Sequence, residues 1–281
     1  MSGGTLFVVA TPIGNLGDVT RRSVETLGTS DVVLAEDTRR TRQLLTHLGI
    51  AGKEVQRFDA HASDADVERL VAKFAEGANI AIVTDAGTPG VSDPGEKLVE
   101  AAVAAGVKVV PIPGASAVLA ALTASGLAGD GRFRFLGFLP RSGTERREAI
   151  VTVCATPETV VLYEAPNRVQ ATMRDLADAT PDRRACVARE LTKLHEEFVR
   201  GTCASLAAEE REWIGEIAIV LGPHEPQSRA ETIDDAALDA RIDEAIARGE
   251  HARAASERLA AWSGRSKRDV YERYVARKAS R

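Results

Sequence analysis

Short apolar runs alternate with segments of helical spacing through the first half of the chain. The runs are rich in valine and isoleucine, are bounded by loop residues, and lie at 6–10, 32–35, 80–83 and 107–112. Apolar residues recur at helical spacing over 39–48, 67–74, 98–105 and 115–125. Because strands that alternate with helices form parallel sheets, this pattern predicts a mostly parallel sheet covered by helices.

The alternation changes at Gly129-Asp130-Gly131, which we interpret as a hinge. Only two helical segments, 145–153 and 169–179, interrupt the strand-like runs that follow it. Those runs lie at 133–138, 160–163, 185–189, 198–200 and 217–221. Closely spaced strands favour a mixed sheet with hairpins. We therefore predict two α/β domains, at 1–128 and 129–223.

The last part of the chain is predicted to be helical. A linker by composition, 222–228, precedes helical segments at 233–247, 252–262 and 267–276. The last two segments flank a break at 263–266, so they resemble a helix-turn-helix, and a simple helical hairpin is the alternative. We predict a small helical domain at 229–281.

Charge is distributed unevenly along the chain. From residue 253 to residue 281 there are nine Lys or Arg against three Asp or Glu, an excess of six positive charges. The whole chain carries a net charge of −5, so the remainder carries −11. A basic appendage on an acidic body suggests a polyanionic partner. A solvated helical surface explains the same charges equally well.

Composition describes a soluble globular protein, with 281 residues, 44% hydrophobic and 27% charged. Neither a membrane-spanning stretch nor a secretory leader is apparent, and we expect a cytoplasmic protein. The three cysteines, Cys154, Cys186 and Cys203, are odd in number and lack metal-ligand spacing, and the five histidines are scattered. We therefore expect reduced thiols and no metal site.

Four loops follow predicted strands, and a parallel sheet brings such loops to one edge. The loop at 84–95 carries three glycines and two prolines, which let the backbone approach a ligand and hold one shape. It matches neither the G-x-G-x-x-G nor the G-K-S/T phosphate loop. We expect one ligand-binding crevice formed by the loops at 11–18, 36–41, 84–95 and 113–117.

Motifs in these loops and in the second half occur together in one order. They are T-P-I-G-N-L at 11–16, E-D-T-R at 36–39, D-A-G-T-P at 85–89, S-D-P-G at 92–95, P-G-A-S-A at 113–117, G-F-L-P at 137–140, Y-E-A-P at 163–166 with Arg168, and R-E-L-T-K at 189–193. The set resembles the tetrapyrrole methylase superfamily, in particular its branch that acts on ribosomal RNA, over nearly the whole chain.

The resemblance implies a fold of two α/β domains of the tetrapyrrole-methylase type, here with a small C-terminal helical domain. It implies S-adenosyl-L-methionine as cofactor, bound between the α/β domains, and usually a homodimer. The implied reaction is 2'-O-methylation of a cytidine ribose in the decoding region of 16S ribosomal RNA, either naked or within the small ribosomal subunit.

The resemblance also implies a set of cofactor-binding residues. The turn at Thr88-Pro89 corresponds to a cofactor-binding turn written Asp-Pro in other members. The methionine end of the cofactor is expected along Gly87, Thr88, Val91 and Ser92, with Ser116 and Ala117 opposite. Tyr163, Leu191 and the strand near Ile219 are expected around the adenine, and Pro12 and Asp85 complete the set.

The attacking ribose hydroxyl is a poor acid, so a base or a positive field should lie near it. Candidate bases are Glu36, Asp37 and Glu190, with Lys193 or Arg39 as electrostatic partners. An Asp37–Arg39 ion pair that fixes the loop, and a cap formed by Glu190, are the structural alternatives. The cationic candidates, including Arg40 and Arg168, equally suit RNA phosphates.

Two other functions fit part of the pattern. A methylase acting on a tetrapyrrole would have the same cofactor site but no need of a basic tail. A nonenzymatic RNA-binding module would explain the tail and leave the four loops unused. The chain also departs from the family pattern at 58–63, where only His61 is kept, at Asn167, where the family commonly has His, and at His195, where it usually has an aromatic residue.

Overall fold

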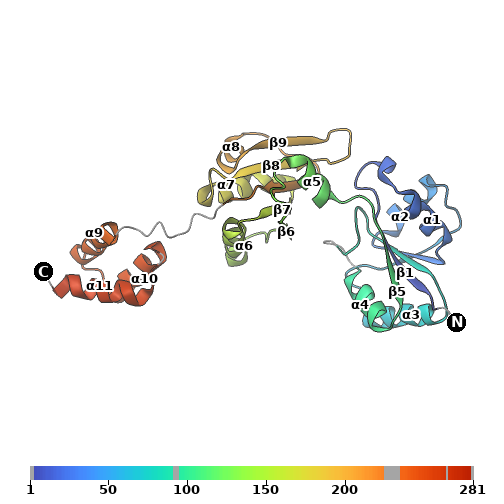
Figure 1. Ribbon diagram of the computed structural model, residues 1–281, viewed down its shortest axis with the longest axis horizontal. Coiled ribbons are helices and arrows are strands. Elements are labelled where there is room, and N and C mark those ends of the chain that lie inside the picture. Colours follow the sequence, from blue (N-terminus) through green and yellow to red (C-terminus); the bar gives the residue numbers. More distant parts are fainter. Residues whose placement is uncertain (1–2, 91–94, 225–234, 264, 280–281) are drawn as a thin grey trace. The chain divides into compact units, whose positions relative to one another are not determined.

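The computed structural model describes residues 3–90, 95–224, 235–263 and 265–279. The chain divides into two compact units, Met1–His224 and Glu225–Arg281. The first unit contains two five-stranded sheets with their helices, and the second contains three helices (Figure 1). In the described part of the chain no helix is long and apolar enough to cross a membrane.

The first sheet is entirely parallel and has the strand order β3-β2-β4-β1-β5. Helices α3 and α4 lie on one face of this sheet and α1 and α2 on the other (Figure 1). Side chains that alternate along the strands pack against the two pairs of helices. The predicted parallel sheet is therefore confirmed. Its elements are β1 (Thr5–Val9), α1 (Arg21–Thr29), β2 (Val32–Ala35), α2 (Thr38–His47), β3 (Glu54–Arg57), α3 (Asp64–Ala75), β4 (Ile80–Val83), α4 (Glu96–Ala104) and β5 (Lys108–Ile112).

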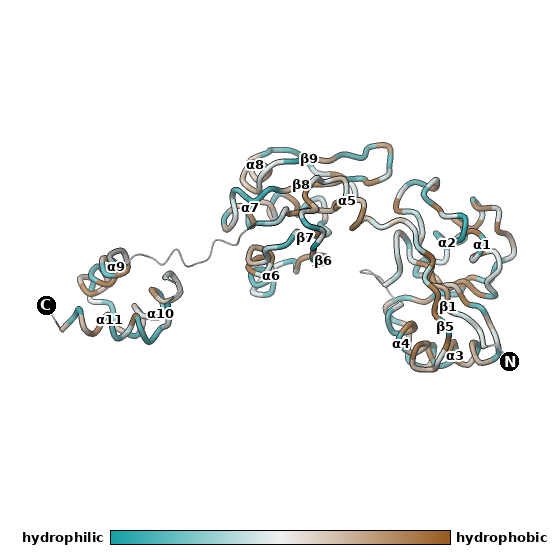
Figure 2. The backbone as a smooth tube through the Cα atoms, in the orientation of Figure 1, coloured by the Kyte–Doolittle hydropathy of each residue, from teal (hydrophilic) through white to brown (hydrophobic). Residues whose placement is uncertain are grey.

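Hydropathy explains which elements of this layer the sequence reveals. All four residues of β2 and of β4 are buried, and the central strands are the most hydrophobic part of the layer (Figure 2). By contrast, β3 lies at the sheet edge and buries only Val55, and α1 buries only Ser23 and Leu27. Neither gives an apolar run, so neither is among the elements read from the pattern.

The second sheet is mixed, with the strand order β6-β7-β10-β8-β9. Only β6 and β7 pair in parallel; the other pairs are antiparallel, including the β8–β9 hairpin, as predicted. Helices α6, α7 and α8 cover one face. The elements are β6 (Phe133–Phe138), α6 (Gly143–Ala155), β7 (Thr159–Glu164), α7 (Val169–Ala179), β8 (Arg184–Arg189), β9 (Glu197–Thr202), α8 (Cys203–Ala208) and β10 (Ile217–Leu221).

Helix α5 (Ala117–Ser125) covers the opposite face of this second sheet, although it directly follows the last strand of the first sheet. Its buried side chains Val118, Ala121 and Leu122 share a core with Val161 and Val220. The segment that begins at the edge of the first sheet thus packs on the second. This brings the start of α5 between the strand ends of the two sheets.

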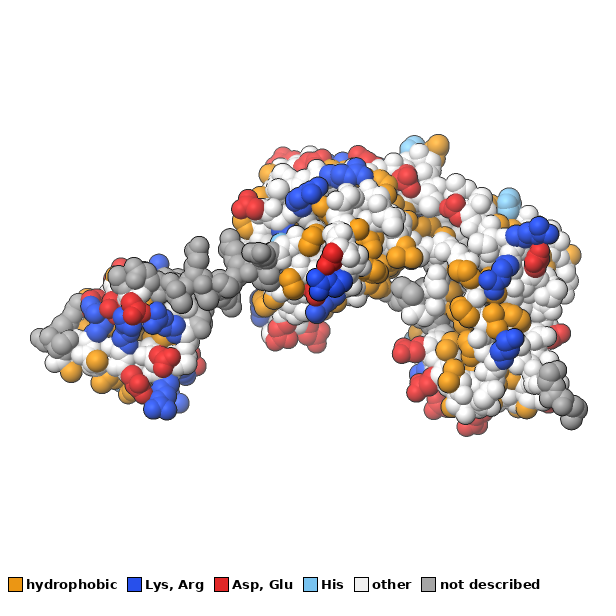
Figure 3. Space-filling view, viewed as in Figure 1, with side chains coloured by type: hydrophobic (Ala, Val, Ile, Leu, Met, Phe, Trp, Pro, Cys, Tyr) orange, Lys and Arg blue, Asp and Glu red, His pale blue; other side chains and the backbone are white. Residues whose placement is uncertain are grey.

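The second unit consists of α9 (Asp235–Ala247), α10 (Ala252–Ser263) and α11 (Lys267–Ala279), the three helices expected from the sequence. Its core is formed by Leu238, Ile242, Leu259, Val270 and Tyr274, all fully buried. Acidic and basic side chains lie side by side on its surface (Figure 3). The unit therefore has a small apolar core of its own.

All three cysteines are free thiols. Cys186 and Cys203 are buried in the second sheet layer and Cys154 is half-buried. Burial raises the pKa of all three thiols, that of Cys203 to about 11.

Candidate active site

Three loops at the carboxyl edge of the first sheet are joined by hydrogen bonds. Thr11 and Gly87 exchange backbone hydrogen bonds of 2.8 and 3.1 Å across an isolated bridge. The Thr11 hydroxyl donates to the Thr84 carbonyl at 3.1 Å, and the Thr88 hydroxyl donates to the Ala115 carbonyl at 3.2 Å. Gly87 has φ 89°, a left-handed conformation that suits glycine. The loops after β1, β4 and β5 thus form one fixed wall.

The segment after β8 forms a second wall and is strained. Glu190 (φ 51°) and Thr192 (φ 66°) are the non-glycine residues with left-handed backbone in the described part of the chain. Such conformations cost energy and cluster at functional sites. The Glu190 and Glu216 backbones are tied, since Glu190 N donates to Glu216 O and Glu216 N donates to Glu190 Oε1, both at 2.9 Å.

Lys193 lies at the end of this strained segment and is held by two carboxylates. Its Nζ donates to Glu190 Oε1 at 2.8 Å and to Glu216 Oε2 at 3.0 Å. A Cβ atom at Gly14 would lie 2.4 Å from Lys193 Cγ, so only glycine lets the loop after β1 lie this close. The wall from the first sheet and the strained segment therefore meet at Lys193.

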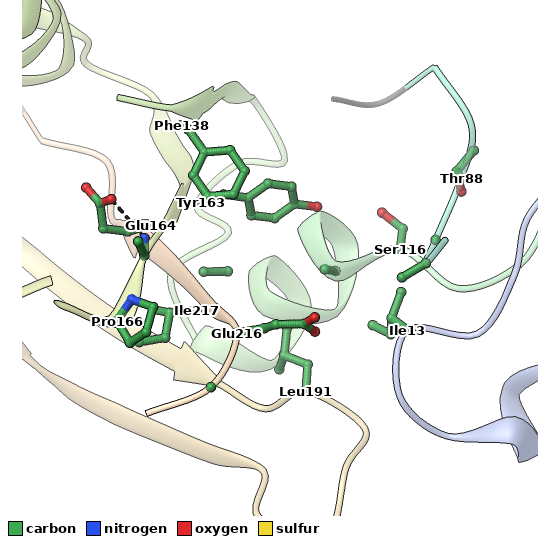
Figure 4. A pocket seen from close by; sticks show the side chains of 16 residues that line it. Ile13, Thr88, Ser116, Phe138, Tyr163, Glu164, Pro166, Leu191, Glu216 and Ile217 are labelled. Atoms are coloured by element: carbon green, nitrogen blue, oxygen red, sulfur yellow. Dashed lines mark hydrogen bonds between the residues drawn. The ribbon is translucent and has the colours of Figure 1, made fainter. Parts of the chain in front are cut away.

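A cavity of about 350 Å³ lies between these walls (Figure 4). Phe138 and Tyr163 lie together on one side, with ring centroids 5.5 Å apart, and Ile13, Thr88 and Ser116 lie on the other (Figure 4). Both sheets contribute residues to it. The lining residues are Ile13, Ala86, Gly87, Thr88, Ser116, Ala117, Phe138, Tyr163, Glu164, Ala165, Pro166, Leu191, Gly215, Glu216, Ile217 and Ala218.

Six residues expected to bind a cofactor line this cavity: Gly87, Thr88, Ser116, Ala117, Tyr163 and Leu191. Pro12 and Asp85 are adjacent to lining residues, Ile13 and Ala86, rather than in the lining. Val91 and Ser92 lie outside the described residues. The six residues come from the loops after β4, β5 and β8, from the first position of α5 and from strand β7, so the motifs predicted a set that the fold brings together.

Asp37 caps a helix. Its carboxylate accepts the backbone N–H of Arg39 at 2.8 Å and of Arg40 at 3.3 Å, as the N-cap of α2, and these bonds hold the pKa of Asp37 below its ordinary value. The ion pair of this loop is Arg40–Asp85, at 3.2 Å, and the Arg39 side chain is exposed. The anticipated Asp37–Arg39 side-chain pair is thus replaced by a backbone cap.

The remaining candidate carboxylates differ in proton affinity. Burial, and then the negative charges of Asp85 and Asp59, raise the pKa of Glu36. The hydrogen bond from Lys193, and then that from the Glu216 backbone, lower the pKa of Glu190. Burial alone would lower the pKa of Lys193, but its hydrogen bonds to Glu190 and Glu216 outweigh burial and raise it. At neutral pH Glu190 is therefore a carboxylate and Lys193 an ammonium.

Glu164 is a cavity residue that sequence reasoning did not single out. Its side chain is 1% exposed and accepts hydrogen bonds from the Thr172 hydroxyl at 2.6 Å and the Ala165 N–H at 2.9 Å. Arg168 Nε lies 3.3 Å from Glu164 Oε1, and Arg168 Nη2 donates to the carbonyls of Leu139 and Pro140, both at 2.9 Å. The motifs Y-E-A-P and G-F-L-P were the signal in the sequence that could have pointed to Glu164, because this network joins the two motifs.

In the described residues no group of three or more His, Cys, Asp or Glu is arranged to hold a metal ion. The carboxylates that line the cavity are Glu164 and Glu216, and Glu216 accepts a hydrogen bond from the Lys193 ammonium, which Glu190 also holds. Aromatic rings on one side and hydroxyl groups on the other suit an elongated ligand that has a flat ring and a polar end.

Comparison with known proteins identifies the family. The family model for tetrapyrrole (corrin/porphyrin) methylases matches residues 5–207. A ribosomal RNA small subunit methyltransferase I from Synechocystis sp. is 43% identical over 96% of each chain. Its counterpart from Halalkalibacterium halodurans is 40% identical over 96% of this chain and 94% of its own. The chain belongs to the ribosomal RNA small subunit methyltransferase I family of tetrapyrrole methylases.

Solved structures agree with this fold. Uroporphyrin-III C-methyltransferase from Thermus thermophilus, complexed with S-adenyl homocysteine, has a TM-score of 0.54 at 20% identity, over 78% of this chain and 97% of its own. A diphthine synthase has a TM-score of 0.59 at 18% identity, over 78% of this chain and 91% of its own. The resemblance and the fold class inferred from the motifs are confirmed.

Proposed function

We propose that the chain methylates small-subunit ribosomal RNA with S-adenosylmethionine, at the 2'-oxygen of a cytidine in the decoding region of 16S RNA. The observation that carries this proposal is the cavity of about 350 Å³, lined by the family's motifs from both sheets. The relatives' name supplies the substrate class, since the chain aligns with them along 96% of its length.

The cavity residues fit such a cofactor. The volume of the cavity, about 350 Å³, is within the range of small-molecule sites, roughly 300–1,000 Å³. Gly87 and Gly215 line it with left-handed backbones, at φ 89° and 87°. A Cβ atom at Gly215 would lie 2.3 Å from Glu190 Oε1. Glycine therefore lets the backbone itself form the cavity wall at both points.

We assign the two ends of the cavity from its chemistry. Gly87, Thr88, Ser116 and Ala117 would hold the methionine end, where hydroxyl groups and backbone meet a charged amino acid. Tyr163 and Leu191 would hold the adenine, and Phe138 joins them because its ring packs on Tyr163. When bound, S-adenosylmethionine supplies an electrophilic methyl group.

The protein must align the ribose oxygen with that methyl group and help to remove its proton. Lys193 and Glu190 do not line the cavity, but Lys193 bonds both Glu190 and the lining residue Glu216, and we assign the pair to this task. The Lys193 ammonium stabilises negative charge that develops on the attacking oxygen, and Glu190 accepts the proton. The lowered pKa of Glu190 makes it a weak base, so the electric field of Lys193 contributes more to the rate than proton transfer to Glu190 does.

Asp37 and Arg39 then have supporting roles. Asp37 caps α2, and the exposed Arg39 beside it contacts an RNA phosphate. We further propose that the enzyme acts as a homodimer in the cytoplasm, with the helical unit in contact with RNA.

The test is transfer of labelled methyl groups to small ribosomal subunits that lack the modification, followed by alkaline hydrolysis. A protected phosphodiester at one cytidine is expected, and label on a base would refute the 2'-O assignment. Transfer to a tetrapyrrole alone would favour the other methylase function. If calorimetry detected no binding of S-adenosylmethionine, only the nonenzymatic RNA-binding module would remain as an explanation.

Lys193→Ala tests the catalytic assignment. Loss of one group that stabilises a developing oxyanion typically lowers the rate about 100- to 1,000-fold. Single-turnover methyl transfer should fall by that order while cofactor affinity changes little. Lys97→Ala, on the exposed surface of α4, is the matched control and should keep the full rate. Equal rates in both variants would remove Lys193 from the mechanism.

A further inference from the structure

Two groups of cationic side chains in the helical unit have different surroundings. The first group joins α11 to α9. Arg273 Nη2 donates to Asp239 Oδ2 at 3.1 Å, and Arg277 contacts Asp239 at 2.9 Å and Asp243 at 2.6 Å. These side chains are between 23% and 35% exposed, so the pairs are partly withdrawn from water. This group holds the helices together.

The second group surrounds an open cavity of about 630 Å³ at the first turns of α10 and α11. Its lining residues are His251, Ala252, Arg253, Lys267, Arg268 and Tyr271, and none of them is acidic. Tyr271 is 45% exposed, which is high for a large aromatic residue beside a cavity. Three cations and an accessible ring therefore face one space.

Acidic neighbours hold these cations only weakly. Lys267 pairs with Glu257, and Arg268 pairs with Glu272, both at 2.9 Å. All four side chains are at least 48% exposed, and ion pairs in water are weak and screened by salt. Arg253 forms no ion pair within the described residues. The cations are therefore available to a stronger anionic ligand.

We propose that this cavity binds a single-stranded segment of RNA, with a base stacked on Tyr271 and phosphates on Arg253, Lys267 and Arg268. An aromatic ring combined with fixed cations is how proteins bind single strands, because every base has a face that can stack. Inorganic phosphate or an acidic peptide would use the cations and leave the ring idle. The inference rests on the proposed function, since it assigns part of the RNA contact.

The test uses the full chain and a fluorescent, unstructured oligouridylate of about ten nucleotides, titrated at several salt concentrations. Loss of a stacking ring weakens binding about 5- to 150-fold per base, which is the fold-change for roughly 1–3 kcal/mol. Tyr271→Ala should lose affinity by that factor, whereas Tyr271→Phe keeps the ring and should bind like the wild type.

Arg253→Ala tests the phosphate contact. The slope of log affinity against log salt should flatten by about 0.7 for one lost contact to a single strand. Arg248→Ala is the matched control in the same unit, because it removes an equal charge from a 71% exposed side chain already paired with Glu244. That variant should keep the wild-type slope. Unchanged melting temperatures and cofactor affinity would exclude misfolding as the cause.

Parallel methyl transfer to small subunits separates this inference from the proposed function. If the wild type transfers methyl but Tyr271→Ala binds the oligonucleotide equally well, the cavity assignment is overturned and the proposed function stands. If the wild type binds through Tyr271 but transfers no methyl to RNA, the cavity assignment stands and the proposed function fails. Equal displacement by polyglutamate of matched charge would overturn stacking in favour of a general polyanion surface.

Discussion

Removal of the Glu164 carboxylate should destabilise the first unit and loosen the aromatic side of the cavity. Glu164 is 1% exposed and joins Arg168, Thr172 and the Ala165 N–H. Removing one partner of a buried ion pair costs about 3–5 kcal/mol, because the other charge stays buried. Arg168 keeps two carbonyl acceptors, so we expect the lower end, about 3 kcal/mol, for Glu164→Ala.

Two further variants make this magnitude informative. Glu164→Gln keeps the volume and one acceptor, and we expect it to cost about 1–2 kcal/mol. Asp175→Asn removes the exposed partner of Arg146, a neighbour of the same network, whose side chain is 43% exposed. The amide keeps an oxygen acceptor for Arg146, which is 12% exposed, so this loss should be about 1–2 kcal/mol. The measurement is urea unfolding monitored by the fluorescence of Trp213, which lies in the core of this unit. Trp262 of the other unit is replaced by phenylalanine in every variant, so that Trp213 alone gives the signal.

Cofactor binding gives a second measurement. Arg168 holds the carbonyls that follow Phe138, whose ring packs on Tyr163. An aromatic pair is worth about 0.5–1.5 kcal/mol beyond its buried area. Glu164→Ala should therefore weaken S-adenosylmethionine binding about 2- to 12-fold, at 1.4 kcal/mol per tenfold. If Glu164→Ala and Asp175→Asn lose the same small stability and bind cofactor equally, Glu164 does not anchor the cavity.

Three other outcomes are expected. Gly215→Ala, at φ 87° and with its Cβ 2.3 Å from Glu190 Oε1, should cost at least about 1–2 kcal/mol; an unchanged urea midpoint would contradict this. The pKa of Glu190 is lower in the folded protein than in the unfolded protein. Its contribution to stability is therefore present above the unfolded-state pKa and is lost as the pH falls through the folded-state pKa. The difference in unfolding free energy between wild type and Glu190→Gln should therefore shrink from about pH 6 to pH 3, and a constant difference would argue against the pair. Asp239→Asn should speed amide exchange in α11 by weakening the α9–α11 network, whereas unaltered protection would mean that the apolar core alone holds the helix.

The layers of both sheets follow from periodicity, because a strand covered on both faces must be apolar throughout and a helix only along one stripe. Strand β3, which lies at a sheet edge and buries one residue, escapes such reasoning because it has no apolar run. Helix α5 shows a second limit. Its sequence indicates a helix after the last parallel strand, but only packing reveals that it covers the other sheet.

The site was predictable where a motif carries its own signal and was missed where distant residues create it. Gly87 and Thr88 stand in a loop whose glycines and prolines mark it. Glu164 reads as a polar strand end, and only its arginine and threonine partners explain its burial. The left-handed backbone at Glu190 has no local signal, because the residue is not glycine.

The net charge of the C-terminal segment is also a poor guide to its surface. Its excess of six positive charges suggests a uniformly basic surface. Arg273 and Arg277 are paired, however, with aspartates 34 positions earlier in the chain. Pairing at that separation leaves no trace in composition, so the surface open to an anion is smaller than the count implies.

The buried thiols make site-specific labelling simple. A thiol with a pKa of about 11, as at Cys203, is ionised in roughly one molecule in 3,000 at pH 7.5, against about one in ten for an ordinary cysteine. Since the thiolate is the reactive form, and burial also raises the pKa of Cys154 and Cys186, maleimide dyes should react more slowly with the native cysteines than with an exposed one. A cysteine introduced in place of the exposed Lys278 on α11 can therefore carry a dye that reports RNA binding in the otherwise native sequence.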